Sequence, residues 1–325
     1  MSAQRVPLGA TGLEVSPLCL GGNVFGWSIG EAASFAVLDA YLAAGGNFID
    51  TANIYSAWGP GNRGGESETI IGRWIASRGV RDEVVIATKV GMAGGDHAKG
   101  LTRALVRTGI EGSLKRLGVD RIDLFYAHED DAETPLDETM AAFDELVREG
   151  LVGAVGASNY DATRFSAALA ASDANHLTRY SVMQAWFNLA ERDKYEGALE
   201  RLCADEGVGV LSYFSLARGF LTGKYRPGQE AGASPRAEGV IESFMNPAGL
   251  AVLDVLDDVA ERHGATPAQV SLAWLIARPS LVGPVASATT PEQVREIVGA
   301  IDLRLDGGSL ARLDAAAAAS DGDGY

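Results

Sequence analysis

Four side chains with acid–base chemistry follow apolar runs of the sequence. Asp50 ends the run NFID, Lys89 follows EVVIAT, His128 follows RIDLFYA, and Tyr55 comes five residues after Asp50. A buried lysine needs a counter-ion such as Asp50, and a phenol beside the held ammonium is expected to have a lowered pKa. With His128 to orient a carbonyl oxygen, the set suits addition of hydride from a cofactor to C=O, with the proton passing through Tyr55.

Each of these residues also has an ordinary structural interpretation. A lone aspartate after a strand is often a helix cap, and a buried tyrosine is often a core residue with a bonded hydroxyl. A lysine at a strand end is usually solvated, and a lone histidine is more often structural than catalytic. The position of the four together, around three successive strand ends, favours the catalytic interpretation.

The elements that would position these residues alternate between short apolar runs and longer stretches of helical period. Continuous apolarity in the runs indicates strands buried on both faces, as in a parallel sheet. Eight strand–helix units without a linker predict one α/β domain, residues 1–325, folded as a (β/α)8 TIM barrel. A β-hairpin around residues 9–12 is expected to close its bottom. The expected strands are 16–22, 47–50, 83–88, 121–127, 153–158, 181–185, 207–214 and 281–286, and the first helices are 31–45, 66–79, 101–118 and 136–150.

One long segment breaks this alternation. Residues 218–247 are rich in Gly, Pro and charged residues and contain no expected strand. A loop of that length in a compact domain is usually functional or mobile. The acidic end SDGDGY, about 320–325, is expected to be a frayed tail. Thr102 and Asp161 are expected to cap the helices that follow them.

Composition limits the classes of partner. With 27 basic and 43 acidic residues, the chain has a formal net charge of −16, which disfavours binding to nucleic acid or to an anionic membrane surface. No apolar run reaches the length of about 18 residues that a membrane span needs, and no signal-peptide pattern is present. The two cysteines, Cys19 and Cys203, form no disulfide framework. A cytoplasmic location is expected, and the oligomeric state is left open.

One glycine-rich segment matches the sequence pattern of a dinucleotide-binding turn. GPGNRG at 59–64 matches GxGxxG, but that motif acts in the tight turn directly after a first strand. Here Tyr55 and Trp58 separate it from the strand that ends at Asp50, so a doubly wound nucleotide-binding sheet is not favoured. No Walker A, HExxH, paired CxxC or GxSxG pattern supports phosphoryl transfer, zinc proteolysis or serine hydrolysis.

Longer motifs resemble those of the aldo-keto reductases, in order along nearly the whole chain. GGNFIDTANIY (45–55) resembles the first signature of that family, and RLGVDRIDLFYAH (116–128) resembles the second. VVIATKVG (84–91) resembles the lysine motif, and VGASNY (155–160) resembles the Ser-Asn pair. SYFSLARGFLTGKY (212–225) is similar to the cofactor-covering loop of bacterial members. The short region after the last helix resembles members without a long C-terminal substrate loop.

The resemblance implies an NAD(P)(H)-dependent oxidoreductase that interconverts carbonyl compounds (aldehydes, ketones, aldoses) and alcohols. It implies that Tyr55 is the general acid/base and that Asp50, Lys89 and His128 complete a catalytic tetrad. No metal is expected, because the phenol and the imidazole replace a Lewis acid.

The resemblance also implies a set of cofactor contacts. Ser158, Asn159 and Gln184 would hydrogen-bond the nicotinamide carboxamide, and Tyr213 would stack on its ring. The full implied set is Gly22, Asn23, Ser158, Asn159, Gln184, Tyr213, Ser215, Leu216, Arg218, Lys224, Ser287, Thr289, Gln293 and Glu296.

The family favours NADP(H), but this chain departs from the basic pattern that holds the 2′-phosphate. In VASATTPEQVREIV (285–298), Ser287 and Gln293 stand where the family commonly has Lys and Arg, and Glu296 is retained. A phosphate normally meets Arg or Lys, so NAD(H) stays possible. The remaining candidates to meet the phosphate are Ser287, Thr289, Arg295, Lys224 and Arg218.

The substrate site and two other functions complete the expectations. Phe25, Trp27, Trp58 and Tyr126 are expected to rim the barrel mouth as an apolar wall for a small carbonyl or alcohol substrate. Some relatives of this fold are auxiliary subunits of channels, so the alternative is a non-catalytic or weakly catalytic, cofactor-sensing regulatory subunit. A metal-dependent barrel isomerase would need several acids at strand ends, where the sequence offers only Asp50 and residues 129–131.

Overall fold

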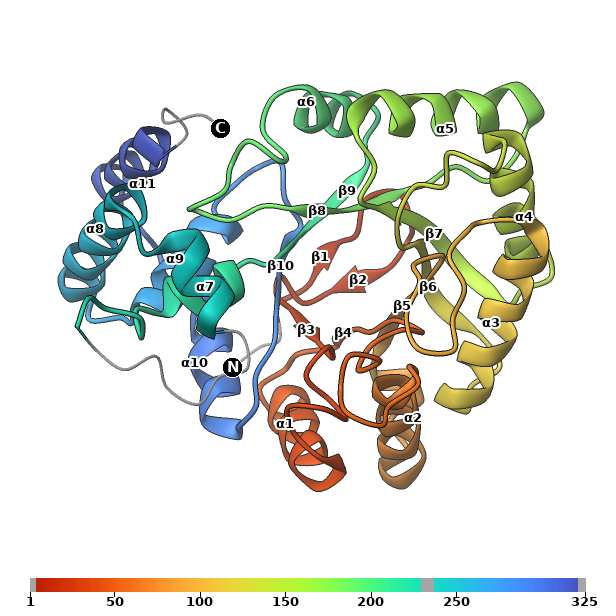
Figure 1. Ribbon diagram of the computed structural model, residues 1–325, viewed down its shortest axis with the longest axis horizontal. Coiled ribbons are helices and arrows are strands. Elements are labelled where there is room, and N and C mark those ends of the chain that lie inside the picture. Colours follow the sequence, from red (N-terminus) through yellow and green to blue (C-terminus); the bar gives the residue numbers. More distant parts are fainter. Residues whose placement is uncertain (1–3, 229–236, 321–325) are drawn as a thin grey trace.

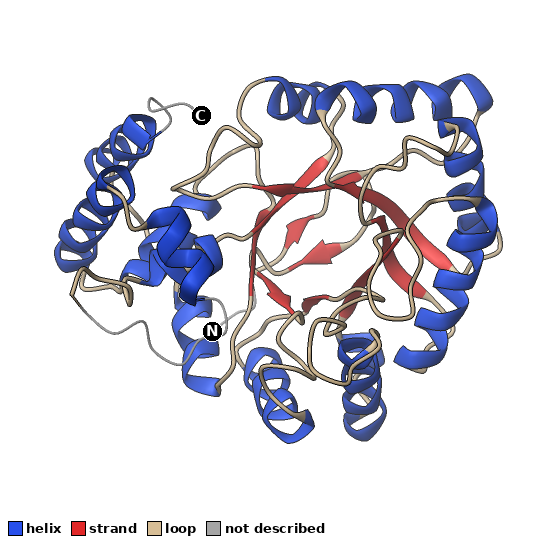
Figure 2. Cartoon of the chain, viewed as in Figure 1, coloured by secondary structure: helices blue, strands red, loops and turns tan. Residues whose placement is uncertain are grey.

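The chain folds into a closed barrel of parallel strands surrounded by helices (Figure 1), and the red ring of strands lies inside the blue helices in Figure 2. The computed structural model describes residues 4–228 and 237–320. Around the barrel the strand order is β10, β3, β4, β5, β6, β7, β8 and β9, and each neighbouring pair is parallel. The expected (β/α)8 TIM barrel is confirmed.

The eight expected strands are all present within a few residues of their expected bounds. Their residues are almost all buried because helices cover the outside and side chains fill the inside. The barrel strands are β3 (Cys19–Gly21), β4 (Phe48–Asp50), β5 (Val85–Val90), β6 (Ile122–Ala127), β7 (Val152–Ser158), β8 (Val182–Trp186), β9 (Gly209–Tyr213) and β10 (Gly283–Ala286).

The helices begin at residues that the sequence marks. The side chain of Thr102 accepts a hydrogen bond from the N–H of Leu105, and that of Asp161 accepts one from Arg164, so both expected N-caps are confirmed. The α-helices are α1 (Glu31–Ala43), α2 (Glu66–Arg78), α3 (Arg103–Leu117), α4 (Leu136–Arg148), α5 (Ala162–Asn175), α6 (Ala198–Asp205), α7 (Ala237–Phe244), α8 (Pro247–His263), α9 (Pro267–Ile276), α10 (Pro291–Gly299) and α11 (Gly307–Ser320), with 3₁₀ helices η1 (Arg81–Glu83) and η2 (Ala217–Thr222).

A small hairpin closes the N-terminal end of the barrel, as expected. Strands β1 (Val6–Pro7) and β2 (Glu14–Val15) pair antiparallel. Leu8 and Val15 are fully buried and pack into the cluster that fills the barrel interior. Gly9 has φ +52° in the turn, and a Cβ there would lie 2.6 Å from the backbone N of Gly209. The hairpin backbone therefore packs directly against the start of β9, at the N-terminal end of the barrel.

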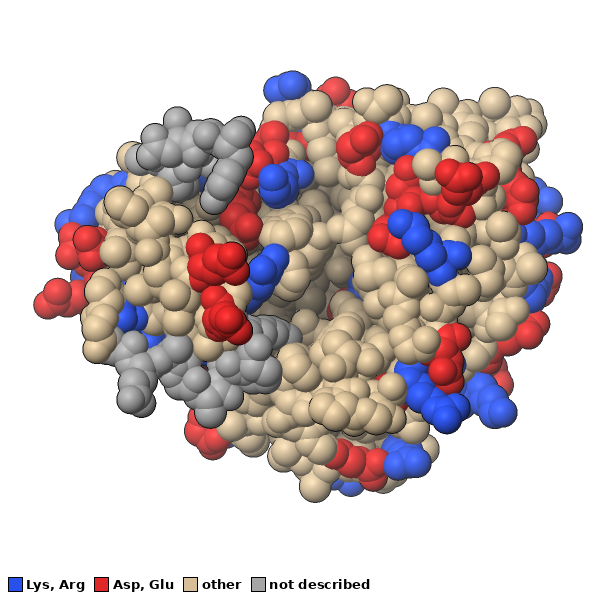
Figure 3. Space-filling view, viewed as in Figure 1, with Lys and Arg blue, Asp and Glu red and all other residues tan. Residues whose placement is uncertain are grey.

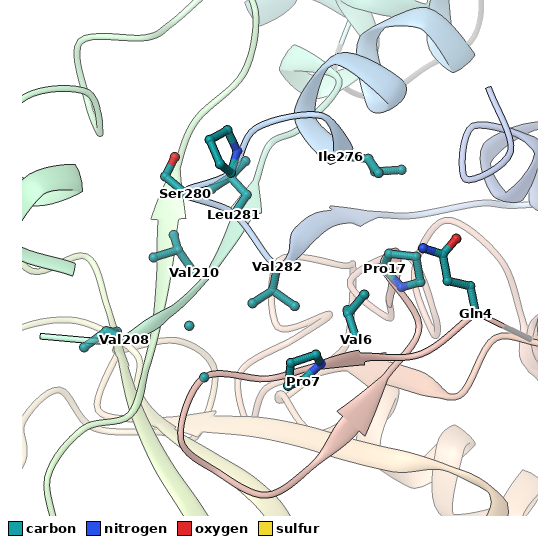
Figure 4. A pocket seen from close by; sticks show the side chains of 13 residues that line it. Gln4, Val6, Pro7, Pro17, Val208, Val210, Ile276, Ser280, Leu281 and Val282 are labelled. Carbon is teal, nitrogen blue, oxygen red and sulfur yellow. The ribbon is translucent and has the colours of Figure 1, made fainter. Parts of the chain in front are cut away.

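A pocket of about 370 Å³ remains beside this hairpin. Figure 4 shows Val6 and Pro7 of β1 facing Val210 of β9, with Val282 just before β10. These residues stand at the beginnings of their strands, so the pocket lies at the end of the barrel opposite Asp50 and its neighbours.

The long segment 218–247 is partly helical, which corrects the expectation of a plain loop. It contains most of η2, all of α7 and the start of α8, while residues 229–236 lie outside the described residues. Of the expected tail at 320–325, residues 321–325 also lie outside them. In the described ranges no single helix has the length and apolarity needed to cross a membrane. Helices α7 and α8 reach that length and apolarity only when taken together, and the chain bends by 100° between them.

Candidate active site

Asp50, Tyr55, Lys89 and His128 meet at the C-terminal end of three neighbouring strands. Asp50 ends β4, Lys89 lies near the end of β5, His128 follows β6, and Tyr55 lies in the loop after β4. The Nζ of Lys89 donates hydrogen bonds to Asp50 Oδ2 (2.6 Å), to the carbonyl oxygen of Thr51 (2.8 Å) and to the phenol oxygen of Tyr55 (2.8 Å). The Tyr55 hydroxyl donates to Asp50 Oδ2 at 3.2 Å. The rings of Tyr55 and His128 lie edge to face, with centroids 6.0 Å apart.

Burial controls the protonation of these groups. It raises the pKa of the Tyr55 phenol well above its usual range, and the charge of Asp50 adds to this rise. The lowered pKa expected from Lys89 is therefore wrong in its net direction, and Tyr55 is protonated at neutral pH. Burial also lowers the pKa of Lys89, against the opposing effect of Asp50. The pKa of His128 is lowered well below its usual range by burial and then by Lys89, so the imidazole is neutral.

One tryptophan contacts Tyr55, and a second tryptophan contacts the first. Trp58 is 47% exposed and contacts Tyr55 edge to face at 6.0 Å between ring centroids. The Trp27 ring lies 5.8 Å from that of Trp58, and its indole N–H donates to the carbonyl oxygen of Asn23. The surface over the barrel is hollowed beside α7, and both acidic and basic side chains border the hollow (Figure 3).

The expected rim positions of Phe25 and Tyr126 are wrong. Both side chains are fully buried. Tyr126 pairs in register with Lys89 of the adjacent strand and belongs to the cluster inside the barrel, so its ring packs below the site. Phe25 packs into the layer between barrel and helices. Burial of a short strand and of the turn after β3 could not be read from residue type alone.

Four residues expected at the nicotinamide lie together on the next strands. Ser158 ends β7 and pairs in register with Gln184 of β8. Asn159 has φ +57° and accepts a hydrogen bond from the Tyr213 hydroxyl through its Oδ1. The amide of Gln184 donates to Asp50 Oδ1 at 2.8 Å, which joins this group to the tetrad. Their expected cofactor contacts stay predictions.

Several residues expected at the adenosine phosphate already have hydrogen-bond or ion-pair partners within the chain. Ser287 Oγ donates to Asn23 Oδ1 at 2.6 Å. Gln293 Oε1 accepts from the backbone N–H of Thr289 at 2.8 Å and from its hydroxyl at 3.0 Å. Arg295 is paired with Glu292 at 2.6 Å.

The remaining expected cofactor residues lie around β3, η2 and α10. Gly22 donates its N–H to the carbonyl oxygen of Asp50, and Ser215 Oγ donates to the carbonyl oxygens of Ser212 and Val285. Leu216 is partly buried against the core, and Glu296, on α10, is half-buried. The guanidinium of Arg218 lies over the rings of Trp186 and Phe214, and Lys224 Nζ lies over the ring of Tyr225.

Two contributors were missed by the analysis of the sequence. Thr51 supplies the backbone carbonyl that binds Lys89, and no side-chain pattern signals a backbone acceptor. Trp186 contacts Tyr213 and Arg218 and donates its indole N–H to Glu191. Its place two residues after Gln184, at the end of β8, was the available signal. Within the described ranges, no group of three or more His, Cys, Asp or Glu side chains is placed to hold a metal ion.

Comparison with known proteins agrees with this geometry. The profile of the Aldo/keto reductase family matches residues 17–318. The chain belongs to this family. As an aldo/keto reductase it is an oxidoreductase, and the family uses nicotinamide cofactors and small-molecule substrates.

Its relatives carry several names. An uncharacterized oxidoreductase, YrpG, of Bacillus subtilis is 36% identical over 92% of this chain and 91% of its own. Norsolorinic acid reductase A of Aspergillus parasiticus is 32% identical over 95% of this chain and 80% of its own. A probable voltage-gated potassium channel subunit beta of Arabidopsis thaliana is 32% identical over 91% of this chain and 90% of its own. Because the relatives include both reductases and a channel subunit, their names alone do not define the reaction of this chain.

Proposed function

We propose that this aldo/keto reductase interconverts small carbonyl compounds and alcohols, with Tyr55 as the group that transfers the proton. The arrangement that carries this proposal is the phenol oxygen held 2.8 Å from the Lys89 ammonium, with the Asp50 carboxylate hydrogen-bonded to both groups. Its elevated pKa keeps Tyr55 protonated at neutral pH, as a proton donor must be.

The chain's own residues account for the proton. When a carbonyl oxygen accepts the Tyr55 proton, negative charge is left on the phenol oxygen. The N–H of Lys89 that already points at this oxygen stabilises that charge, and Asp50 keeps Lys89 in place. Neutral His128 can donate a hydrogen bond that orients the carbonyl. In alcohol oxidation the same proton returns to Tyr55.

The residues fit a nicotinamide cofactor. Nδ1 of His128 is buried and finds no hydrogen-bond partner among the described residues. Nearby, the half-buried ring of Tyr213 offers an aromatic face, and the side chains of Ser158 and Asn159 offer donors and acceptors for an amide. When bound, the cofactor supplies or accepts the hydride.

We further propose that the site takes both NAD(H) and NADP(H), with affinities within about tenfold of each other, or about 1.4 kcal/mol. Gln293 occupies the N–H and hydroxyl of Thr289, and Arg295 is engaged by Glu292. Arg218 and Lys224 stack on aromatic rings. Because these groups are already engaged, they add little binding free energy for a 2′-phosphate compared with a 2′-hydroxyl.

The test combines titration with turnover. Purified protein is titrated with NADH and with NADPH by nicotinamide fluorescence, then assayed with a panel of aldehydes, ketones and aldoses. Tyr55→Phe is expected to lower kcat about 10²–10⁴-fold while cofactor affinity is kept. Tyr195→Phe, which removes a buried hydroxyl bonded to Ser280 at the barrel floor, is the matched control and should keep its kcat. Full turnover by Tyr55→Phe, or no binding of either cofactor, refutes the proposal.

The regulatory alternative predicts a different pattern. A cofactor-sensing subunit would bind the cofactor but turn over no carbonyl in the panel. No contact in the described residues favours it, and the intact Asp50–Lys89–Tyr55 arrangement favours catalysis.

A further inference from the structure

Gly65, which follows the glycine-rich segment 59–64, and Gly112 of α3 make room for one arginine. Gly65, at the N-cap of α2, has φ +87°, and a Cβ there would lie 2.4 Å from Cδ of Arg116 on α3. A Cβ at Gly112 would lie 2.9 Å from its Nη1. The Arg116 side chain thus runs through a slot that larger residues at these two positions would obstruct, and its guanidinium is brought to the first turn of α2.

At that turn the guanidinium meets a fully buried carboxylate. Arg116 Nε donates to Glu68 Oε2 at 2.6 Å, and the Glu68 side chain has no exposed surface. The other carboxylate oxygen, Oε1, accepts from the hydroxyl of Thr88 at 2.6 Å. Both oxygens are satisfied, so a charge that would be costly alone is retained behind the barrel wall.

Thr88 connects this carboxylate to the active site. It precedes Lys89 on β5, and because alternate side chains point to opposite faces, Thr88 faces α2 while Lys89 faces the barrel interior. Ser67, which precedes Glu68 on α2, donates to the carbonyl oxygen of Gly22 and accepts from the hydroxyl of Thr51. The first turn of α2 therefore holds the chain at the ends of β3, β4 and β5.

We propose that Glu68 is a positioning residue for Lys89. It holds the end of β5 through its hydrogen bond with Thr88, and its carboxylate, paired with Arg116, contributes to the electrostatic potential at the Lys89 ammonium. This proposal rests on the proposed function for its catalytic meaning. It concerns no residue of the tetrad itself.

The electrostatic part has a definite sign. Burial lowers the pKa of Lys89, and Glu68 opposes this together with Asp50 and Cys19. Loss of the Glu68 charge would leave Arg116 unbalanced, so both changes destabilise the ammonium of Lys89. The titratable or charged groups that act on or contact Lys89 are Asp50 (β4), Tyr55 (loop after β4), Cys19 (β3), Tyr126 and His128 (β6 and its end) and Glu68 (α2).

The test measures the titration of Lys89 directly. The chain has only five lysines, so ¹³C-lysine labelling gives few Cε resonances, and Lys89→Met assigns the one of interest. Glu68→Gln is expected to lower the Lys89 midpoint by about half a pH unit, less than the 1–3 units of a contacting charge. Arg116→Gln should raise it, and the double variant should return it towards the wild-type value.

Glu66→Gln is the matched control. It removes the same charge from the same turn of α2, but Glu66 faces the N–H groups of Arg63 and Gly64 and is partly exposed. Its Lys89 midpoint should equal that of the wild type. A Glu68→Gln midpoint equal to that of the control, or Arg116→Gln and Glu68→Gln shifts of the same sign, overturns the electrostatic part.

The positioning part has its own variant. Thr88→Val keeps the volume and both charges of the Glu68–Arg116 pair but removes the hydrogen bond. It should fold, keep cofactor affinity, and lower kcat about tenfold; an unchanged kcat overturns the positioning part. The Lys89 titration can be measured without turnover. A wild-type protein that reduces no carbonyl would therefore refute the proposed function, whereas the effect of Glu68 on Lys89 would still be tested by the titration.

Discussion

Replacement of Lys89 by methionine tests the buried ion pair at the centre of the site. The Lys89 side chain is 0% exposed and that of Asp50 is 2% exposed, at 2.6 Å between Nζ and Oδ2. Methionine keeps most of the volume but removes all three hydrogen bonds from Nζ. Among the described residues, the Asp50 carboxylate would keep the hydrogen bonds from Gln184 and Tyr55.

The expected cost follows from that geometry. Removal of one partner leaves a buried carboxylate without its counter-charge, which typically costs 3–5 kcal/mol. Lys89→Met should therefore lower the free energy of unfolding by about 4 kcal/mol. Asp50→Asn combined with Lys89→Met removes the stranded charge and should recover at least about 2 kcal/mol of that loss.

Urea unfolding of the wild type, both single variants and the double variant, followed by circular dichroism, measures this cycle. Urea is used because it does not screen charge. Lys99→Met is the matched control: Lys99 is 61% exposed and pairs with Glu129 at 3.3 Å, so its loss should cost under about 1 kcal/mol. A Lys89→Met cost no larger than that of the control, or a double variant no more stable than Lys89→Met, would refute the reasoning.

Three further predictions concern pH, cofactor choice and the barrel floor. Because the pKa of His128 is lowered well below 6.5, the imidazole stays neutral and kcat for carbonyl reduction should be flat from about pH 8 to about pH 6; a midpoint near 6.5 would contradict this. Gln293→Arg should raise affinity for NADPH over NADH about tenfold in fluorescence titrations, and an unchanged ratio would count against the phosphate position assigned to residue 293. Gly9→Ala should destabilise the protein by more than Gly12→Ala in thermal unfolding. A Cβ at Gly9 would lie 2.6 Å from the backbone of Gly209, whereas one at Gly12 would meet nothing within 4 Å. Equal losses of stability would contradict close packing of the hairpin against the barrel.

Much of the fold could be predicted from local signals. Apolar runs separated by helical stretches were sufficient for the barrel, and Thr102 and Asp161 marked helix starts because a cap acts within one turn. The segment 218–247 was harder, since Gly, Pro and charge hid the helices η2 and α7. Those helices are stabilised by packing, as between Phe220 and Phe244, whose rings stack at 5.0 Å between centroids.

The sequence by itself determined which residues gather at the active site. In a parallel barrel all strands end on the same side, so Asp50, Lys89 and His128 had to meet there once each followed an apolar run. Tertiary structure decided their chemical state. The pKa of Tyr55 is raised by burial and by the charge of Asp50, and both effects depend on surroundings that no spacing in the sequence reveals.

Tertiary structure also decided which neighbours matter. Tyr126 proved to be barrel core, and Glu68 gained its partners from β5 and α3, with Arg116 coming from 48 residues away along the chain. Burial and pairing are properties of several elements packed together. A single sequence position carries the residue type, and the packed barrel supplies the solvent exclusion and the partners that give that residue its role.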